Sequence, residues 1–179
     1  MMLPLNEMIW LIESPNGDKC ESLLGDNLVR FKEAWGSSNN HQAWPGGYLD
    51  HVTEVMNIAI TLHASLSTMR PLPIKLSDAL LVLFLHDLEK PWKKEMKFQT
   101  KSDRHGFRLT KIGEYGIVLN LEQLNALTYV EGENDSYRND RRVMNELAAF
   151  CNLCDMTSAR IWHDQPIEEI EEEHEQKTG

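Results

Sequence analysis

Four ionisable side chains of this sequence lie inside apolar stretches with helical periodicity. His51 lies in GGYLDHVTEVMNIA, the pair His86-Asp87 in DALLVLFLHDLEK, and Asp155 in ELAAFCNLCDMTSAR. A buried carboxylate without a partner costs several kcal/mol or more, so these groups need compensation in the folded state. Any fold of the chain must bring them to one another or to a cation, and a shared divalent metal ion is the simplest arrangement.

Helical spacing turns all four groups toward the core. Residues four apart share one face of an α-helix, and each of the four has an apolar residue in that position. These residues are Val55 for His51, Val82 for His86, Leu83 for Asp87 and Cys151 for Asp155. A second pair, His163-Asp164, is followed by Gln-Pro and a glutamate-rich tail, which is typical of a helix end. Only the first pair is therefore a candidate site.

Two imidazoles and two carboxylates are the ligands expected for an octahedral first-row divalent ion with open water positions. Mn, Co, Ni, Fe, Zn and Mg all remain open, although a closed structural zinc site more often carries thiolates. The pair Cys151-x-x-Cys154 has no second CxxC to complete such a zinc site. We expect these two cysteines to pack as small apolar side chains.

This pattern, His…His-Asp…Asp, resembles the HD-domain superfamily of metal-dependent phosphohydrolases. The resemblance covers residues 41–163 and includes HQAWPGGYLDHV, HDLEK of the HD-x-x-K form, RHGFRLTKIGEYGIVLNLEQLNAL and CDMTSAR. It implies an all-α fold, a single-domain HD-type helical bundle with the metal site between core helices. It also implies that the metal ligands are His51, His86, Asp87 and Asp155, and that Lys90 contacts phosphate.

The resemblance bears on the number of metal ions as well. Members with a two-metal centre carry extra histidines between the HD pair and the last aspartate. His105 matches one of them, but this chain has Val130 and Glu131 where a second is often found. This departure favours one metal ion, with a weaker second site that uses His105 and Glu131 as the alternative.

The chain is expected to form one domain, residues 1–166, followed by an acidic tail, residues 167–179, that is frayed or disordered. No β-alternation is found, and caps and breakers mark the helix ends. The expected elements are a helix over 19–35, the His51 helix between Pro45-Gly46-Gly47 and Pro71, the HD helix between an N-cap at Ser77 and Pro91, a helix ending at Gly116, a helix capped by Asn120, and a helix over 141–162.

Composition narrows the classes of function. Three cysteines are an odd number, MMLPLNEMIWLIES lacks the basic start of a signal peptide, and no apolar run approaches the ~20 residues that span a bilayer. We therefore expect a cytoplasmic protein with no disulfide and no membrane partner. The net charge of −10 argues against a nucleic-acid groove, whereas a small anion can still bind locally beside a metal ion.

A metal ion at such a site would acidify a bound water, which then attacks a phosphoester. Lys90 could neutralise the phosphate, as could Lys93 or Arg108, and His105 or His41 could protonate the leaving group. The sequence has no Walker-type phosphate loop, so hydrolysis is favoured over transfer from ATP.

The predicted function is hydrolysis of a phosphoester of a small nucleotide, with mono- or deoxynucleotides favoured. The alternatives are a cyclic-nucleotide or oligonucleotide phosphodiesterase and a non-catalytic module that binds metal or nucleotide. Apolar residues on the outer side of the His51 helix indicate either a homo-oligomer contact or a helix that is buried on all sides. They are Met56, Ile58, Ile60 and Leu62.

Overall fold

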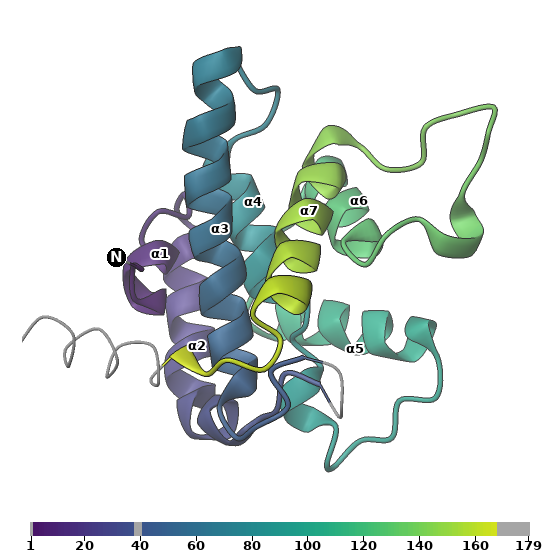
Figure 1. Cartoon of the computed structure of the whole chain (residues 1–179). Helices are drawn as coiled ribbons and strands as arrows, with labels where there is room; N and C mark the ends of the chain where they lie inside the picture. The colour runs from purple at the N-terminus through teal and green to yellow at the C-terminus, as the bar shows by residue number, and fades with distance from the viewer. Residues whose placement is uncertain (1, 38–40, 168–179) are drawn as a thin grey trace, which may run out of the picture.

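The chain folds into a helical bundle, seen in a computed structural model that describes residues 2–37 and 41–167 (Figure 1). These residues contain no strand, and the all-α class predicted from the sequence is confirmed. The α-helices are α1 (Leu5–Ile9), α2 (Asn16–Glu33), α3 (Gly47–Met69), α4 (Leu76–Leu85), α5 (Lys101–Glu114), α6 (Leu121–Tyr129) and α7 (Glu146–Ile161). Two 3₁₀ turns, η1 (Lys90–Trp92) and η2 (Asn134–Ser136), lie between them.

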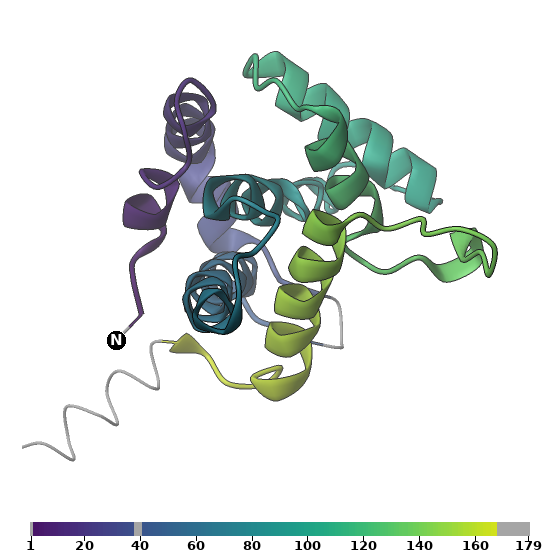
Figure 2. The same cartoon turned by 90° about the horizontal axis from the view of Figure 1, so that it is seen from above.

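Helix α4 forms the centre of the bundle. Every residue from Ala79 to Leu85 is buried, which explains why this helix is apolar on all sides rather than on one face. Helices α3, α6 and α7 pack against it, and α3 and α7 also pack against each other. Seen from above, α1 and α2 lie on one side of this centre and α5, α6 and α7 on the other (Figure 2). The three helices that carry the candidate ligands therefore meet in the core.

Glycines bring the loop before α3 close to that helix. Gly46 has a left-handed φ of 87°, and α3 begins at the next residue. A Cβ atom on Gly47 would lie 2.0 Å from the carbonyl oxygen of Gln42, and Gly36 donates its N–H to the same oxygen at 2.9 Å. The chain can fold back so tightly only because these positions carry no side chain. The close approach holds residues 41 and 42 beside the start of α3.

Several helix ends differ from the predicted ones. The N-cap prediction at Ser77 is wrong, because Lys75 is the N-cap and the Ser77 hydroxyl accepts a hydrogen bond from the Glu13 N–H at 2.8 Å. The HD helix does not continue to Pro91, since it ends at Leu85 and a 3₁₀ turn follows. The last helix begins at 146, not at 141, because the Asn145 side chain caps it. The Asn120 cap is confirmed.

The predicted acidic tail, 167–179, lies outside the described residues except for residue 167. No helix in the described part of the chain is long and apolar enough to cross a membrane.

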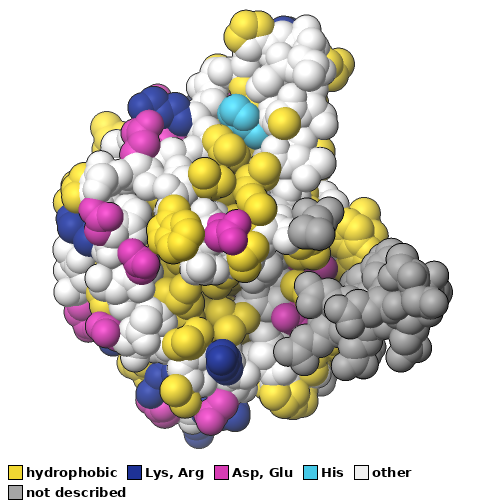
Figure 3. Space-filling view, turned by 90° about the vertical axis from the view of Figure 1, so that its left-hand side faces the viewer, with side chains coloured by type: hydrophobic (Ala, Val, Ile, Leu, Met, Phe, Trp, Pro, Cys, Tyr) yellow, Lys and Arg dark blue, Asp and Glu magenta, His cyan; other side chains and the backbone are white. Residues whose placement is uncertain are grey.

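The apolar residues of α3 that indicated an oligomer contact are accounted for within the bundle. Met56 is fully buried, and the other three, Ile58, Ile60 and Leu62, are half-buried and pack against the core. On the side of the molecule where α1 lies, a band of hydrophobic side chains reaches the surface among single acidic ones (Figure 3). A homo-oligomer stays a prediction.

The close approach at Gly47 gives a test of the fold around the site. We expect Gly47→Ala to lower the free energy of unfolding by about 1–3 kcal/mol, because the new Cβ atom would overlap a backbone oxygen that cannot move freely. Gly25→Ala in α2 is the matched control, since its Cβ atom would meet nothing within 4 Å and alanine favours a helix. Urea unfolding of both variants measures the difference, and equal stabilities would contradict the prediction.

Candidate metal centre

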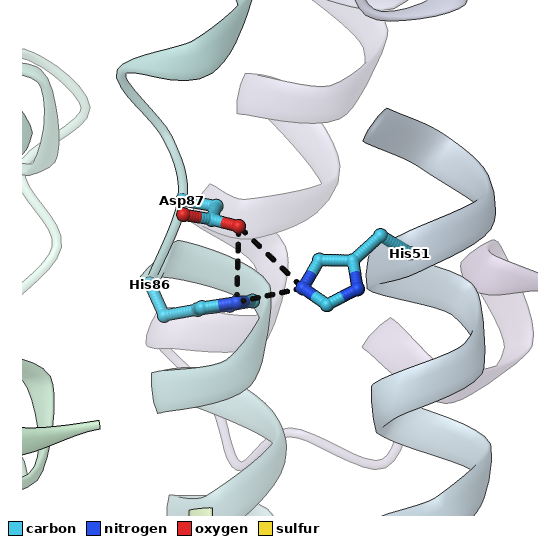
Figure 4. A group of neighbouring side chains, drawn as sticks. All are labelled: His51, His86 and Asp87. Carbon is cyan, nitrogen blue, oxygen red and sulfur yellow. Dashed lines mark hydrogen bonds and ion pairs between the residues drawn. The ribbon is translucent and has the colours of Figure 1, made fainter. Parts of the chain in front are cut away.

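The structure brings His51, His86, Asp87 and Asp155 together. His51 lies on α3, His86 is the C-cap of α4 with Asp87 directly after it, and Asp155 lies on α7. The two Nε2 atoms are 3.2 Å apart, and the Asp155 Oδ1 atom lies 3.1 Å from that of His51 and 3.6 Å from that of His86. The Asp87 Oδ2 atom lies 3.5 Å and 3.3 Å from the same two nitrogens (Figure 4).

Hydrogen bonds at the far side of each ring decide which nitrogen faces this centre. The His86 Nδ1 atom lies 2.7 Å from the carbonyl oxygen of Leu83, which can only accept, so Nδ1 carries the hydrogen. The His51 Nδ1 atom lies 3.0 Å from the Ser158 hydroxyl, which in turn lies 2.6 Å from the Glu54 carboxylate. With Glu54 ionised, the hydroxyl donates to it and accepts from His51. When neutral, both imidazoles then turn an Nε2 lone pair toward the centre.

The charges of the centre depend on one another. Burial lowers the pKa of His51 to about 4. Burial would also lower the pKa of His86, but the charge of Asp87 and hydrogen bonds to both aspartates raise it to about 10. Burial would raise the pKa of Asp87, yet the charges of Lys90 and His86 hold it well below its usual value. Hydrogen bonds to the two imidazoles likewise keep the pKa of Asp155 low against the effect of burial. Near neutral pH the centre therefore holds two carboxylates and one extra proton.

This donor set fits a divalent metal ion. Two nitrogens and two carboxylate oxygens converge, and a single proton can bridge only one pair of them at a time. Donor atoms about 2.1 Å from an ion are about 3.0 Å apart at octahedral angles and about 3.4 Å apart at tetrahedral ones. The observed separations between the imidazole nitrogens and the carboxylate oxygens, 3.1 to 3.6 Å, lie within that range or up to 0.2 Å above it. Within the described residues, His51, His86 and Asp87 form the only group of three such donors that all lie within 4.8 Å of one another. Asp155 on α7 lies outside that group but approaches both imidazoles.

Lys90 and His41 are the two predicted site residues that lie beside the four candidate ligands. The Lys90 ammonium pairs with the Oδ2 atom of Asp87, the atom that also faces the imidazoles. The His41 ring lies 5.0 Å from that of His51, and its Nδ1 atom lies 2.7 Å from Gln42 Oε1. Burial and the charge of Lys90 lower the pKa of His41.

His105 is not joined to this cluster. It lies half-buried on α5, and burial together with the charge of Arg108 lowers its pKa. Glu131, its suggested partner in a second metal site, lies 3.6 Å from Arg108 instead. The second site stays a prediction without support from the geometry.

Arg108, a candidate phosphate contact in the sequence, is buried and supports the turn after α4. It is 4% exposed and donates a hydrogen bond to the carbonyl oxygen of His86. Its Nε atom lies 3.3 Å from the buried carboxylate of Glu89, although the two are not aligned for a hydrogen bond. Together these contacts fix the turn that presents His86 and Asp87.

Sequence reasoning missed three residues behind His51, namely Gln42, Glu54 and Ser158. The Gln42 amide donates to the Glu54 carboxylate at 3.1 Å and to the Ser158 hydroxyl at 3.3 Å. Gln42 also adopts a left-handed φ of 43°, which is uncommon for a residue other than glycine and typical of functional sites. Helical spacing could have identified Glu54 and Ser158. Glu54 follows His51 by three residues and Ser158 follows Asp155 by three, so each shares a helix face with a candidate ligand.

Comparison of the chain with protein-family models, with curated proteins and with solved structures finds no significant match. The resemblance to the HD-domain superfamily therefore rests on the sequence motifs and stays a hypothesis.

The hydroxyl behind His51 yields a prediction about metal affinity. We expect Ser158→Ala to weaken divalent metal binding about 10- to 100-fold, because the His51 ring loses the partner that fixes its tautomer and orientation. Thr157→Ala is the control, since that hydroxyl bonds the carbonyl of Leu153 on the exposed side of the same helix. Calorimetric titration with Mn²⁺ measures both affinities. Equal affinities would show that Ser158 does not position His51.

The raised pKa of His86 yields a prediction about pH. Its folded value of about 10 exceeds the ordinary value of about 6.5, so its contribution to stability is complete below pH 6.5 and is lost as the pH rises toward 10. We expect the stability of the metal-free protein to fall from about pH 7 to about pH 8.5, by up to about 1.4 kcal/mol per pH unit. A divalent ion replaces the proton, so its stabilising effect should grow over the same range.

Urea unfolding in EDTA and in Mn²⁺ at several pH values tests this dependence. His86→Gln is the control, because it removes the titrating group and should flatten the slope in EDTA. Equal slopes for the variant and the native protein would assign the pH dependence to other groups.

Proposed function

We propose that this chain is a metal-dependent phosphohydrolase that hydrolyses a phosphoester of a small nucleotide. The observation that carries the proposal is that one oxygen of Asp87 and one of Asp155 each lie 3.1 to 3.6 Å from the Nε2 atoms of both His51 and His86 in the core of the bundle. The resemblance of the same residues to the HD-domain signature supports it. When bound, a divalent ion supplies a nucleophilic water near neutral pH and polarises a phosphoryl oxygen.

The residues around the centre prepare it for an anionic substrate. Ser158 and the Leu83 carbonyl hold the two imidazoles with their lone pairs inward. Asp155, with 16% of its side chain exposed, is the most accessible of the four candidate ligands. Asp155 and the half-buried His41 therefore mark one accessible side of the centre.

Lys90 supplies positive charge at the point where a phosphate would bind. Its ammonium pairs with the Asp87 oxygen that also faces the imidazoles, so it would give way where Asp87 helped to hold a metal ion. The ammonium, displaced from Asp87, is then available to a phosphate oxygen. One lysine thus balances Asp87 in the free protein and the phosphate in the complex.

His41 is the residue best placed to give a proton to the leaving group. Its lowered pKa keeps the imidazole neutral in the free protein. The negative charge of a bound phosphate acts in the opposite direction and favours protonation of the ring. Substrate binding therefore prepares His41 as a general acid. Mono- or deoxynucleotides are the favoured substrates, because the site lies in a compact and acidic chain.

Phosphate release tests the proposal. A panel of ribo- and deoxynucleoside mono-, di- and triphosphates is assayed with Mn²⁺, Co²⁺, Ni²⁺, Mg²⁺ or EDTA. We expect metal-dependent release that falls by at least about 100-fold in Asp87→Asn and Asp155→Asn, because each variant loses a charged ligand. Asp164→Asn, in the exposed His163-Asp164 pair, is the matched control and should keep full activity.

Two outcomes would contradict the phosphohydrolase proposal. Release that persists in EDTA or in both ligand variants would remove the metal centre from the reaction. No release from any nucleotide by folded, metal-loaded protein would overturn the proposed substrate class and favour cyclic or oligomeric nucleotides or a binding function.

A further inference from the structure

A cavity of about 740 Å³ lies between α2 and the segment that follows Asp87, and Lys90, the partner of Asp87, is part of its lining. Its volume is in the range of pockets that bind nucleotide-sized ligands. The α2 side contributes Arg30 and Trp35, and the other side contributes Lys90, Lys93 and Lys94. Residues 1–35 lie outside the HD resemblance, so this cavity is built partly from the chain's own N-terminal region.

Lys90 connects the cavity with the metal centre. Its side chain lines the cavity while its ammonium pairs with Asp87. A phosphate held between the centre and Lys90 would therefore have the rest of its molecule in the cavity. The lining of the cavity then determines which leaving group the site accepts.

The lysine side of the cavity carries two solvent-exposed lysines, Lys93 and Lys94. Arg30 is engaged, since it pairs with Glu95 and lies over the Trp92 ring. Lys93 and Lys94 form no ion pair with any carboxylate in 2–37 or 41–167. Burial lowers the pKa of Lys93 and so does the neighbouring charge of Lys90, whereas Glu89 and Asp87 act in the opposite direction. In a chain with a net charge of −10, these lysines form a local group of cations at which an anion can bind.

The α2 side of the cavity offers an aromatic surface. Trp35 lies at the rim and is 44% exposed. The other two tryptophans near the site already have partners within the protein. Trp92 packs against Phe31, and the Trp44 indole N–H donates to the Asp50 carboxylate at 2.7 Å. An exposed indole beside a cationic wall is suited to stack a nucleobase.

We propose that this cavity binds the nucleoside part of the substrate on Trp35 and a second phosphate, beyond the scissile one, on Lys93 and Lys94. The inference rests on the proposed function and narrows its substrate class to nucleotides with at least two phosphates. Nucleoside di- and triphosphates, including deoxynucleotides, are then favoured over nucleoside monophosphates. Asp26 and Glu33 line the α2 side of the cavity, and their negative charge places the phosphates on the opposite, lysine side.

Binding without turnover tests the cavity separately from the reaction. The full chain is titrated calorimetrically in EDTA at low ionic strength with ADP, AMP and inorganic pyrophosphate. We expect ADP to bind on the order of tenfold more tightly than AMP. Lys93→Gln and Lys94→Gln should each weaken ADP and pyrophosphate but leave AMP nearly unchanged. Trp35→Leu should weaken ADP and AMP on the order of tenfold, because a stacking contact is lost, and leave pyrophosphate unchanged.

Matched controls are Lys97→Gln, a lysine of the same segment outside the cavity, and Trp10→Leu, an exposed tryptophan beside α1. Equal affinities for ADP and AMP, no binding of either, or losses shared by the control variants would overturn the cavity proposal. Metal-dependent phosphate release measured in parallel belongs to the proposed function alone. A failure of the reaction and a failure of the cavity are therefore distinguishable.

Discussion

The structure depends on the burial of two carboxylates and two imidazoles in one core. Each of these groups would destabilise the fold if it were buried alone, and together they compensate one another. Helix α4 is central and apolar on all sides, so its last residue, His86, reaches the middle of the bundle. Helices α3 and α7 then bring His51 and Asp155 to the same place. The packing of these three helices therefore also assembles the candidate metal centre.

Behind the centre, a set of neutral and charged hydrogen-bonding groups links the core with the loop before α3. Ser158 connects His51 with Glu54, whose burial raises its pKa to about 7, and Gln42 bonds to both Ser158 and Glu54. Gln42 can reach them because the glycines around it let the loop fold back against α3. The orientation of a core imidazole therefore depends on the backbone of a surface loop. The same loop carries His41, so the candidate acid and the candidate ligand are placed by shared contacts.

The cations on the two sides of the centre differ in their partners and in their access to solvent. On one side Arg108, fully enclosed, ties the turn after α4 to Glu89 and does not reach the surface. On the other side Lys90 pairs with Asp87 and opens onto a cavity with further lysines. Arg108 therefore stabilises the fold, whereas the lysines that line the cavity remain available to an anion. This division gives an acidic chain a local group of cations beside the candidate metal centre.

The sequence by itself determined the helical class and pointed to four polar residues that the fold brings together. Periodicity is a local property, so it predicts that His51 and Asp155 face inward without knowledge of the fold. His86 and Asp87 are buried as well, although Asp87 lies beyond the end of α4. Helix ends were harder, because the end of α4 is set by contacts of the turn that follows it, which no local signal records.

The tertiary structure alone decided which of the remaining residues reach the site. His41 and His105 were equivalent candidates in the sequence, yet only His41 lies beside the centre, because glycines fold its loop back while α5 carries His105 toward Arg108. The cavity with Trp35 likewise exists only because α2 packs next to the turn after α4. Contacts between segments far apart in the chain depend on the packing of the whole bundle, and helical spacing carries no information about them.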